Sequence, residues 1–207
     1  VGHWLSGNIG HDRKDVGMLI KCFCESFNDA KDRPALILKT SSATFSIKQR
    51  EFLSDKITNI TKNYSNPPSI YLLFGQLTDN EMNGLYNHPK VKSMVSITKG
   101  EGYGRPLLEY SMTGKPVIAS NWSGHKDFLP MDKAIMIGGK LVEVDESAVN
   151  DFILKNSKWF TSNYSEVVEV LKIVYNDYET FLERSESLRV ENNEKFSIES
   201  ITDEFRL

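Results

Sequence analysis

Apolar residues follow two spacings in turn along this chain, and this alternation predicts strands separated by helices. Short continuous apolar runs, typical of buried strands, occur at residues 35–38, 70–74, 92–97, 117–119 and 134–137. Apolar residues three and four positions apart predict helices at 15–27, 47–64 and 106–113, and Thr78 with Glu81 has the capping-box pattern of another short helix. Continuous apolar strands joined by helices are buried on both faces. We therefore expect an α/β fold with a doubly wound, Rossmann-like parallel sheet.

From about Asn163 the apolar spacing is helical throughout, and Ser197 is placed to cap a last short helix. This change divides the chain into a Rossmann-like part, residues 1–160, and a C-terminal helical extension, residues 161–207. We expect the extension to pack on the first part within one domain.

Composition limits the classes of function. With 40% hydrophobic and 26% charged residues, the chain has the balance of an ordinary globular protein. Its net charge of −3 argues against nucleic acid as a partner, and no apolar run approaches the roughly 18 residues of a transmembrane segment. Cys22 and Cys24 lie on one predicted helix facing different directions, so we expect buried thiols and a cytoplasmic protein.

Residues 101–109, Glu-Gly-Tyr-Gly-Arg-Pro-Leu-Leu-Glu, carry the strongest chemical signal. The segment joins a predicted strand to a helix that Pro106 should begin, since proline fits the first helical position. The amides of Leu107, Leu108 and Glu109 would then lack helical acceptors and attract a phosphate. Gly102 and Gly104 would allow a close approach to the backbone, and the two acids would accept bonds from hydroxyl groups. The pattern indicates a site for a phosphorylated, hydroxyl-rich ligand.

Several residues at this edge have two interpretations. The loops 75–78, 98–105 and 120–125 all follow strands, at the sheet edge where ligands bind in such folds. Lys39, Lys99 and Arg105 there could contact a phosphate or sugar, or could be solvated. His125 could be a turn residue or a ligand contact, and Glu109 could simply stabilise its helix dipole. The sequence gives Glu101 no structural role.

The stretch EGYGRPLLEYSMTGKPVIAS, with Glu101 and Glu109 separated by seven residues, closely resembles the signature of the group 1 glycosyltransferases. Residues 77–87 are similar to the helix before that signature, and residues 123–128 to its Gly-Gly-x-x-Glu turn. The segments 12–14 and 16–20 resemble the family's Lys-Gly-x-x-x-Leu-Ile segment. The resemblance covers roughly residues 1–140.

The resemblance implies a retaining, hexosyltransferase-like enzyme of GT-B fold, and this chain would be its C-terminal, donor-binding domain. The abrupt start at Val1-Gly-His-Trp4 leads us to expect an acceptor-binding N-terminal domain before it, without which the chain alone could be inactive. The donor would be a nucleotide-diphosphate sugar and the acceptor a glycan, lipid, protein or small molecule in carbohydrate biosynthesis. The sequence does not identify the nucleotide, the sugar or the acceptor.

The resemblance also implies roles for individual residues. Glu101 would act at the transferred sugar, Glu109 would bind the ribose, and Lys14 with Arg13 would neutralise the leaving phosphate. His3 stands where the family has an arginine, and the segment that follows it, Trp4 to His11, is longer than the usual loop. The remaining donor-binding residues would be Gly102, Tyr103, Gly104, Arg105, Leu107, Leu108, Lys39 and Thr98. Tyr103 replaces the family's usual Phe.

No metal or other cofactor is expected, since Lys14 and Arg13 could neutralise the phosphate and the chain lacks an Asp-x-Asp motif. Two alternatives stay open. A non-catalytic module could bind a nucleotide-sugar or a partner protein without turnover. A dinucleotide-dependent oxidoreductase is disfavoured, because its third glycine would fall on Arg105 and its ribose-binding acid in the segment Ala119-Ser-Asn121.

Overall fold

The computed structural model describes residues 1–4, 7–41 and 45–206. Two three-stranded parallel sheets and one antiparallel hairpin make up its strands. The first sheet has the order β1-β2-β3 and the second β4-β5-β6, while β7 and β8 form the hairpin. The strands are β1 (Gly2–His3), β2 (Leu36–Ser41), β3 (Ile70–Leu73), β4 (Met94–Ser96), β5 (Val117–Ser120), β6 (Ile135–Ile137), β7 (Gly139–Glu143) and β8 (Lys158–Ser162).

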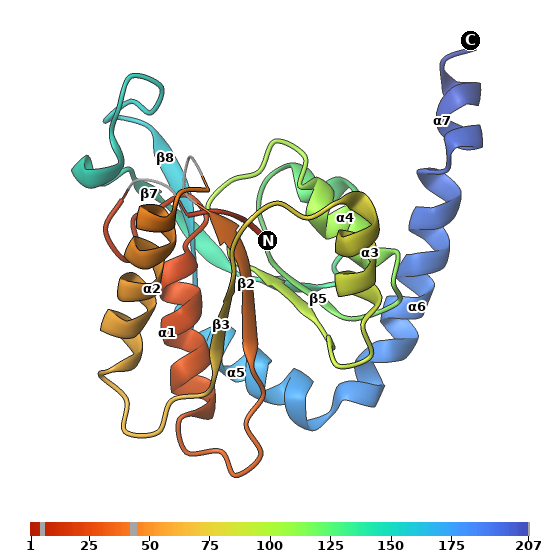
Figure 1. The fold of residues 1–207 in the computed structure, drawn as a ribbon. Helices are drawn as coiled ribbons and strands as arrows, with labels where there is room; N and C mark the ends of the chain where they lie inside the picture. The colour runs from red at the N-terminus through yellow and green to blue at the C-terminus, as the bar shows by residue number, and fades with distance from the viewer. Residues whose placement is uncertain (5–6, 42–44, 207) are drawn as a thin grey trace.

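Helices connect the parallel strands and then close the chain (Figure 1). They are α1 (Val16–Phe27), α2 (Ile47–Thr61), α3 (Asp79–Asn87), α4 (Arg105–Ser111), α5 (Tyr164–Asn176), α6 (Tyr178–Lys195) and α7 (Ile198–Glu204), with 3₁₀ helices η1 (Gly124–Asp127) and η2 (Glu146–Ala148). In Figure 1, α1 and α2 lie beside the first sheet and α3 and α4 beside the second. The expected α/β fold with parallel sheets is confirmed, and so are the C-terminal helices.

Three clusters of buried side chains hold these layers together. One, with Ile20, Leu38 and Leu53, packs α1 and α2 on the first sheet. A second, with Phe23, Ile118 and Leu171, joins α1 and α5 to the second sheet. The third includes Leu107, Leu108 and Leu188 and places α4 and α6 on the other side of that sheet. The second sheet is therefore covered by helices on both faces, as its apolar strands require. The first sheet is covered by α1 and α2 on one face, but Ile37 of β2 and Tyr71 of β3 are 42% and 59% exposed, so the expected burial on both faces is wrong there.

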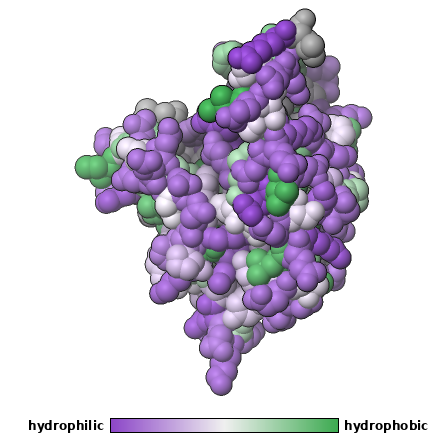
Figure 2. Space-filling model, turned by 90° about the vertical axis from the view of Figure 1, so that its right-hand side faces the viewer, coloured by the Kyte–Doolittle hydropathy of each residue, from purple (hydrophilic) through white to green (hydrophobic). Residues whose placement is uncertain are grey.

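The capping patterns of two helices are confirmed. Thr78 and Glu81 form a capping box at α3, and the Ser197 side chain accepts a bond from the amide of Ser200 at α7. By contrast, α7 has no buried residue and projects beyond the rest of the fold (Figure 1). The face that carries α6 and α7 is mostly hydrophilic with scattered apolar side chains (Figure 2), which fits the charged sequence of α6.

The structure corrects several boundaries and adds strands. The helix expected at 47–64 ends at Thr61, and the one expected at 106–113 spans Arg105–Ser111. The hairpin β7–β8 was not predicted, because every residue of β7 is exposed and forms no apolar run. It is antiparallel, with Leu141 opposite Phe160. Its second strand crosses the expected boundary between residues 160 and 161. The division of the chain at that boundary stays a prediction. Residue 207, the last of the expected extension, lies outside the described residues.

Candidate functional site

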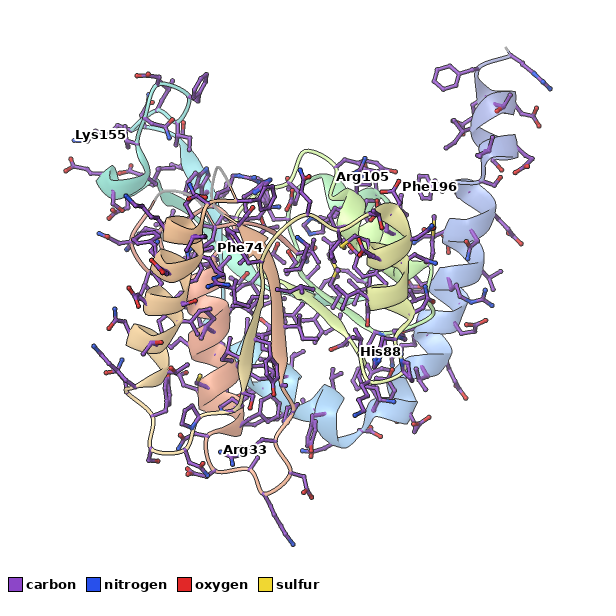
Figure 3. All side chains as sticks on the ribbon, viewed as in Figure 1. Arg33, Phe74, His88, Arg105, Lys155 and Phe196 are labelled. Carbon is purple, nitrogen blue, oxygen red and sulfur yellow. The ribbon has the colours of Figure 1, made fainter. Side chains whose placement is uncertain are left out.

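The candidate site lies where the parallel strands end. Figure 3 shows Arg105 and Lys155 at this upper edge and Arg33 and His88 at the lower one. Three segments meet here: the one before α1, the loop after β4 and the loop after β5. The amide of Lys99 donates to the carbonyl oxygen of Arg13 at 2.8 Å, which ties the first segment to the second. The amide of Gly124 donates to the carbonyl oxygen of Glu101 at 3.1 Å, which ties the third to the second.

Two cations and one carboxylate form the centre of the site. The Lys14 ammonium pairs with the Glu101 carboxylate, and the Arg13 guanidinium lies 3.8 Å from the other carboxylate oxygen. Arg13 also donates to the carbonyl oxygen of Gly100 at 2.7 Å. The side chains of Lys14 and Glu101 are 17% and 13% exposed, so their charges are partly shielded from water but open to a ligand. The sequence assigned Glu101 no structural role, but in the structure its negative charge balances the positive charge of Lys14.

Backbone contacts fix the loop that carries Glu101. The amide of Glu101 donates to the Ser123 hydroxyl at 3.0 Å, and that hydroxyl lies 2.5 Å from the carbonyl oxygen of Glu101. A Cβ atom on Gly124 would lie 2.0 Å from the carbonyl oxygen of Gly102, so only glycine allows the two loops to touch. Gly102 itself has no atom within 4 Å of the place of a Cβ, which leaves its backbone accessible.

The prediction about the amides of α4 is wrong. Gly104 has φ +89° and serves as the N-cap, so α4 begins at Arg105 and Pro106 occupies the second position. Its carbonyl oxygen accepts bonds from Leu107 at 2.8 Å and Leu108 at 3.3 Å, and the amide of Glu109 lies far enough into the helix to bond within it. Within the loop 102–105, no acceptor is found among the described residues for the amides of Gly102, Tyr103, Gly104 and Arg105.

Glu109 and the apolar residues of the motif lie in different surroundings. Glu109 lies on the exposed face of α4, where its carboxylate is 3.1 Å from the Nε atom of Arg105. The side chains of Leu107 and Leu108, by contrast, are buried in the core beside Phe128. Tyr103 also packs against Phe128, with ring centroids 5.2 Å apart, which agrees with a packing role. Any contact of the two leucines with a ligand would have to be through the backbone.

The other predicted donor contacts surround this centre. The His3 ring lies 3.0 Å from the Ser41 hydroxyl, and Lys39 donates to the carbonyl oxygen of Gly75 at 2.5 Å. Thr98 is fully buried, and its hydroxyl donates to the carbonyl oxygens of Arg13 at 3.3 Å and Gly100 at 3.2 Å. Thr98 therefore joins the two central segments instead of facing a ligand. Residues 5–6 of the long Trp4–His11 segment lie outside the described residues.

Sequence reasoning missed a buried charge cluster below these residues. Lys99 is only 2% exposed, and its ammonium lies 3.0 Å from the carboxylate of Asp15, which is fully buried. The Tyr164 hydroxyl donates to the same carboxylate oxygen at 2.8 Å. Burial raises the pKa of Asp15, and Lys99 and Tyr164 oppose that rise. No signal in the sequence distinguishes this buried lysine from a solvated one at the end of a strand.

His125 is a buried residue of η1. Its Nε2 atom lies 2.6 Å from the carbonyl oxygen of Ser120, and burial lowers its pKa. Its Cβ lies 3.1 Å from the place of a Cβ on Gly104, so the ring packs under the glycine loop. The turn interpretation of His125 fits this position.

Asp12 gives a pH-dependent prediction. Its buried carboxylate accepts one bond from the amide of Val16, and burial raises its pKa from 3.8 to about 6. The folded protein therefore holds this proton more tightly than the unfolded chain, and stability falls as pH rises from about 4 to 6. A difference of about two pKa units corresponds to about 3 kcal/mol. We expect Asp12→Asn to remove up to this much of the decline, measured by urea unfolding between pH 4 and 7; parallel curves for both proteins would contradict it.

Two further kinds of feature are absent from the described residues. No helix among them is long and apolar enough to cross a membrane. No group of three or more His, Cys, Asp or Glu side chains in that part of the chain could hold a metal ion. Cys22 and Cys24 are buried free thiols, as expected.

Solved structures of glycosyltransferases share this fold. HepE from Anabaena, in complex with UDP and glucose, matches 99% of this chain and 46% of its own, with TM-score 0.66 and 12% identity. The C-terminal domain of a group 1 family glycosyltransferase, LpcC from Francisella tularensis, matches 92% of this chain and 83% of its own, with TM-score 0.60 and 12% identity. The catalytic domain of a cholesterol-α-glucosyltransferase from Helicobacter pylori matches 93% of both chains, with TM-score 0.59 and 14% identity.

These likenesses concern the fold. The chain has the Rossmann-like fold of GT-B glycosyltransferases, and it spans about half the length of HepE. No known family profile matches the sequence, and no curated protein is detectably similar to it.

Proposed function

We propose that this chain is the donor-binding domain of a retaining group 1 glycosyltransferase, which transfers a hexose from a nucleotide-diphosphate sugar. The observation that carries the proposal is the meeting of Lys14, Arg13 and Glu101 beside the open backbone of Gly102. In an open α/β sheet, ligands bind at this edge, outside the carboxyl ends of the strands. The exposed Glu109 lies on the helix that follows the same loop.

The diphosphate would bind to the cations and to the loop. Cleavage of the bond between sugar and phosphate places negative charge on the leaving diphosphate, which fixed donors stabilise best. Lys14 and Arg13 can supply charge-assisted bonds, and the free amides of Gly102, Tyr103 and Gly104 can supply further donors. This differs from the arrangement inferred from the sequence, because Leu107 and Leu108 already have an acceptor.

Glu101 would face the transferred sugar. Positive charge develops on the sugar as its bond to phosphate breaks, and a nearby carboxylate stabilises that charge. The same carboxylate pairs with Lys14, so a diphosphate that draws Lys14 away frees Glu101 for the sugar. This exchange couples binding of the phosphate to exposure of the charge that the sugar needs. No covalent nucleophile is assigned, and retention stays part of the proposal.

The proposed reaction uses no metal. Two cations balance most of the charge of a diphosphate, so chelation with EDTA should leave nucleotide affinity unchanged.

The acceptor would bind partly to a preceding domain, and the proposed site of action is the cytoplasm. Because HepE was solved with UDP and with UDP-glucose, UDP is the first nucleotide to test.

A calorimetric titration tests the proposal. The 207-residue chain is titrated with UDP, GDP, ADP and NAD, and the titration is repeated with Glu109→Ala. We expect one nucleoside diphosphate to bind selectively and the substitution to weaken it roughly ten- to a hundredfold, since a carboxylate that accepts two ribose bonds contributes roughly 1.5–3 kcal/mol. Glu183→Ala, which removes an exposed acid from α6, is the matched control.

The outcomes separate the alternatives. Binding of NAD alone would support the oxidoreductase. Selective binding of a diphosphate without loss in Glu109→Ala would contradict the assigned role of Glu109. Sugar transfer by a longer protein carrying this chain would distinguish an enzyme from a non-catalytic module that binds the same nucleotide.

A further inference from the structure

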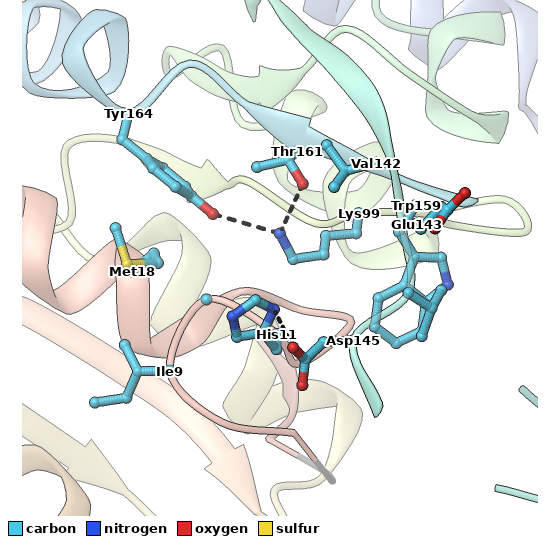
Figure 4. A pocket seen from close by; sticks show the side chains of 12 residues that line it. Ile9, His11, Met18, Lys99, Val142, Glu143, Asp145, Trp159, Thr161 and Tyr164 are labelled. Carbon is cyan, nitrogen blue, oxygen red and sulfur yellow. Dashed lines mark hydrogen bonds and ion pairs between the residues drawn. The ribbon is translucent and has the colours of Figure 1, made fainter. Parts of the chain in front are cut away.

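The buried cluster of Asp15, Lys99 and Tyr164 lies directly behind the proposed phosphate-binding cations. Figure 4 shows Lys99, Thr161 and Tyr164 pointing toward one another in a pocket between α1 and the hairpin. The Lys99 ammonium is 3.3 Å from the Thr161 hydroxyl and 3.4 Å from the Tyr164 hydroxyl, besides its 3.0 Å contact with Asp15. All three donors of the ammonium are thus engaged. None of these groups has a role in the proposed donor contacts.

Lys99 holds the residues on both sides of Lys14. Its backbone amide donates to the carbonyl oxygen of Arg13 at 2.8 Å, and its side chain pairs with Asp15. Lys14 lies between these two anchored residues, so the position of its backbone depends on both contacts. The cluster therefore fixes the position of the Lys14 Cα atom, from which its side chain extends.

Asp15 has an unfavourable backbone conformation. Its φ of +53° lies in the left-handed region, which is uncommon for a residue other than glycine. As the N-cap of α1, it also makes no side-chain capping bond, because its carboxylate points to Lys99 and Tyr164. Such conformations persist where surrounding contacts impose them, and they concentrate at functional sites. Loss of those contacts would let the segment from Asp12 to Asp15 relax and carry Lys14 with it.

The hairpin supplies the outer half of the cluster. Thr161 is a residue of β8, Tyr164 begins α5, and the amide of Phe160 donates to the carbonyl oxygen of Lys99 at 3.2 Å. On the same side, the His11 ring lies 3.7 Å from the carboxylate of Asp145, just after β7. The hairpin thus supports the cation segment from two directions.

We propose that Asp15, Lys99 and Tyr164 are positioning residues that hold Lys14 and Arg13 in place for the phosphate farthest from the nucleoside. The inference rests on the proposed function, because it assumes that these cations bind a diphosphate. It assigns the β7–β8 hairpin a part in binding the donor without any contact with it.

The test compares ligands that differ only in phosphate number. The wild-type chain and Tyr164→Phe are each titrated with uridine, UMP and UDP. If GDP or ADP is the diphosphate that binds, the corresponding guanosine or adenosine series is used. Removal of the hydroxyl should reduce the gain in affinity from UMP to UDP about fivefold and leave uridine binding unchanged. Tyr175→Phe is the matched control, since it also removes a tyrosine hydroxyl from α5. The Tyr175 hydroxyl bonds to the carbonyl oxygen of Asp32, far from the cluster.

A second variant distinguishes a loss of positioning from a general effect on folding. Asp15→Asn with Lys99→Met removes both buried charges together, and asparagine tolerates the left-handed region. We expect this double variant to lose about tenfold of the same gain. Equal weakening of uridine, UMP and UDP would indicate a general structural role and overturn the inference, as would an unchanged gain in both variants. If the wild type bound no nucleoside diphosphate, the proposed function would fail first and the inference with it.

Discussion

Replacement of Lys99 with methionine is expected to lower the free energy of unfolding by about 3–5 kcal/mol. Lys99 and Asp15 are both almost completely buried and 3.0 Å apart. Methionine fills much of the same volume, so little packing is lost. The cost arises because Asp15 keeps its buried carboxylate without the cation that balances it. Urea unfolding at pH 7 measures the difference.

Two further variants make this expectation specific. Asp15→Asn combined with Lys99→Met should be more stable than Lys99→Met alone, because no unpaired charge is left in the interior. Lys133→Met removes a lysine from an exposed pair with Glu191 and should leave the unfolding midpoint unchanged. If Lys99→Met and Lys133→Met had equal midpoints, the buried pair would not contribute to stability.

The sequence predicted the parts of the fold that depend on local apolar patterns. The strands β2, β3, β4, β5 and β6 each coincide with an apolar run, which is the pattern expected of strands in a helix-covered parallel sheet. Burial is less complete than that pattern implies, since Ile37 of β2 and Tyr71 of β3 are exposed. The capping box at Thr78 was also identifiable, since it depends on two side chains three residues apart.

The hairpin β7–β8 was not predictable in the same way. Its pairing joins residues far apart in the chain, such as Gly139 and Ser162, and β7 is exposed along its whole length. A strand stabilised mainly by its partner leaves no apolar run in the sequence. The start of α4 was missed for another reason: Gly104 in its left-handed conformation is the N-cap, so the helix begins at Arg105, one residue before the expected Pro106.

For the candidate site, local sequence and resemblance indicated different things. The motif identified Glu101 and the glycine loop, and the resemblance assigned Lys14 and Arg13 to the leaving phosphate, which stays a prediction. The structure brings both cations to the Glu101 carboxylate. Neither indicated that Lys14 would pair with Glu101, or that Lys99 would be buried behind them. The pair joins segments 87 residues apart, and the burial of Lys99 depends on the packing of α5 and the hairpin, which are separated from α1 by more than a hundred residues.

The Lys14–Glu101 pair predicts opposite effects for its two members. Lys14→Met should weaken binding of the nucleoside diphosphate about a hundredfold, since one charge-assisted contact with the phosphate contributes up to about 3 kcal/mol. Glu101→Gln should instead tighten it about tenfold. Glutamine neither competes with the phosphate for Lys14 nor repels it, and it keeps the size of the side chain.

The nucleotide-sugar separates this exchange from a simple change in net charge. If Glu101 also contacts the sugar, Glu101→Gln should tighten the binding of UDP more than the binding of UDP-glucose. If the chain prefers another base, the same comparison is made between that nucleoside diphosphate and its nucleotide-sugar. Lys172→Met and Glu183→Gln alter the charge by the same amounts on exposed faces of α5 and α6, and both should bind as the wild type does. Weaker binding of the diphosphate by Glu101→Gln would mean that the carboxylate orients Lys14 toward the phosphate instead of competing for it. In that case, the pair would be part of the phosphate site itself, and Glu101 could not be free to stabilise the charge on the sugar.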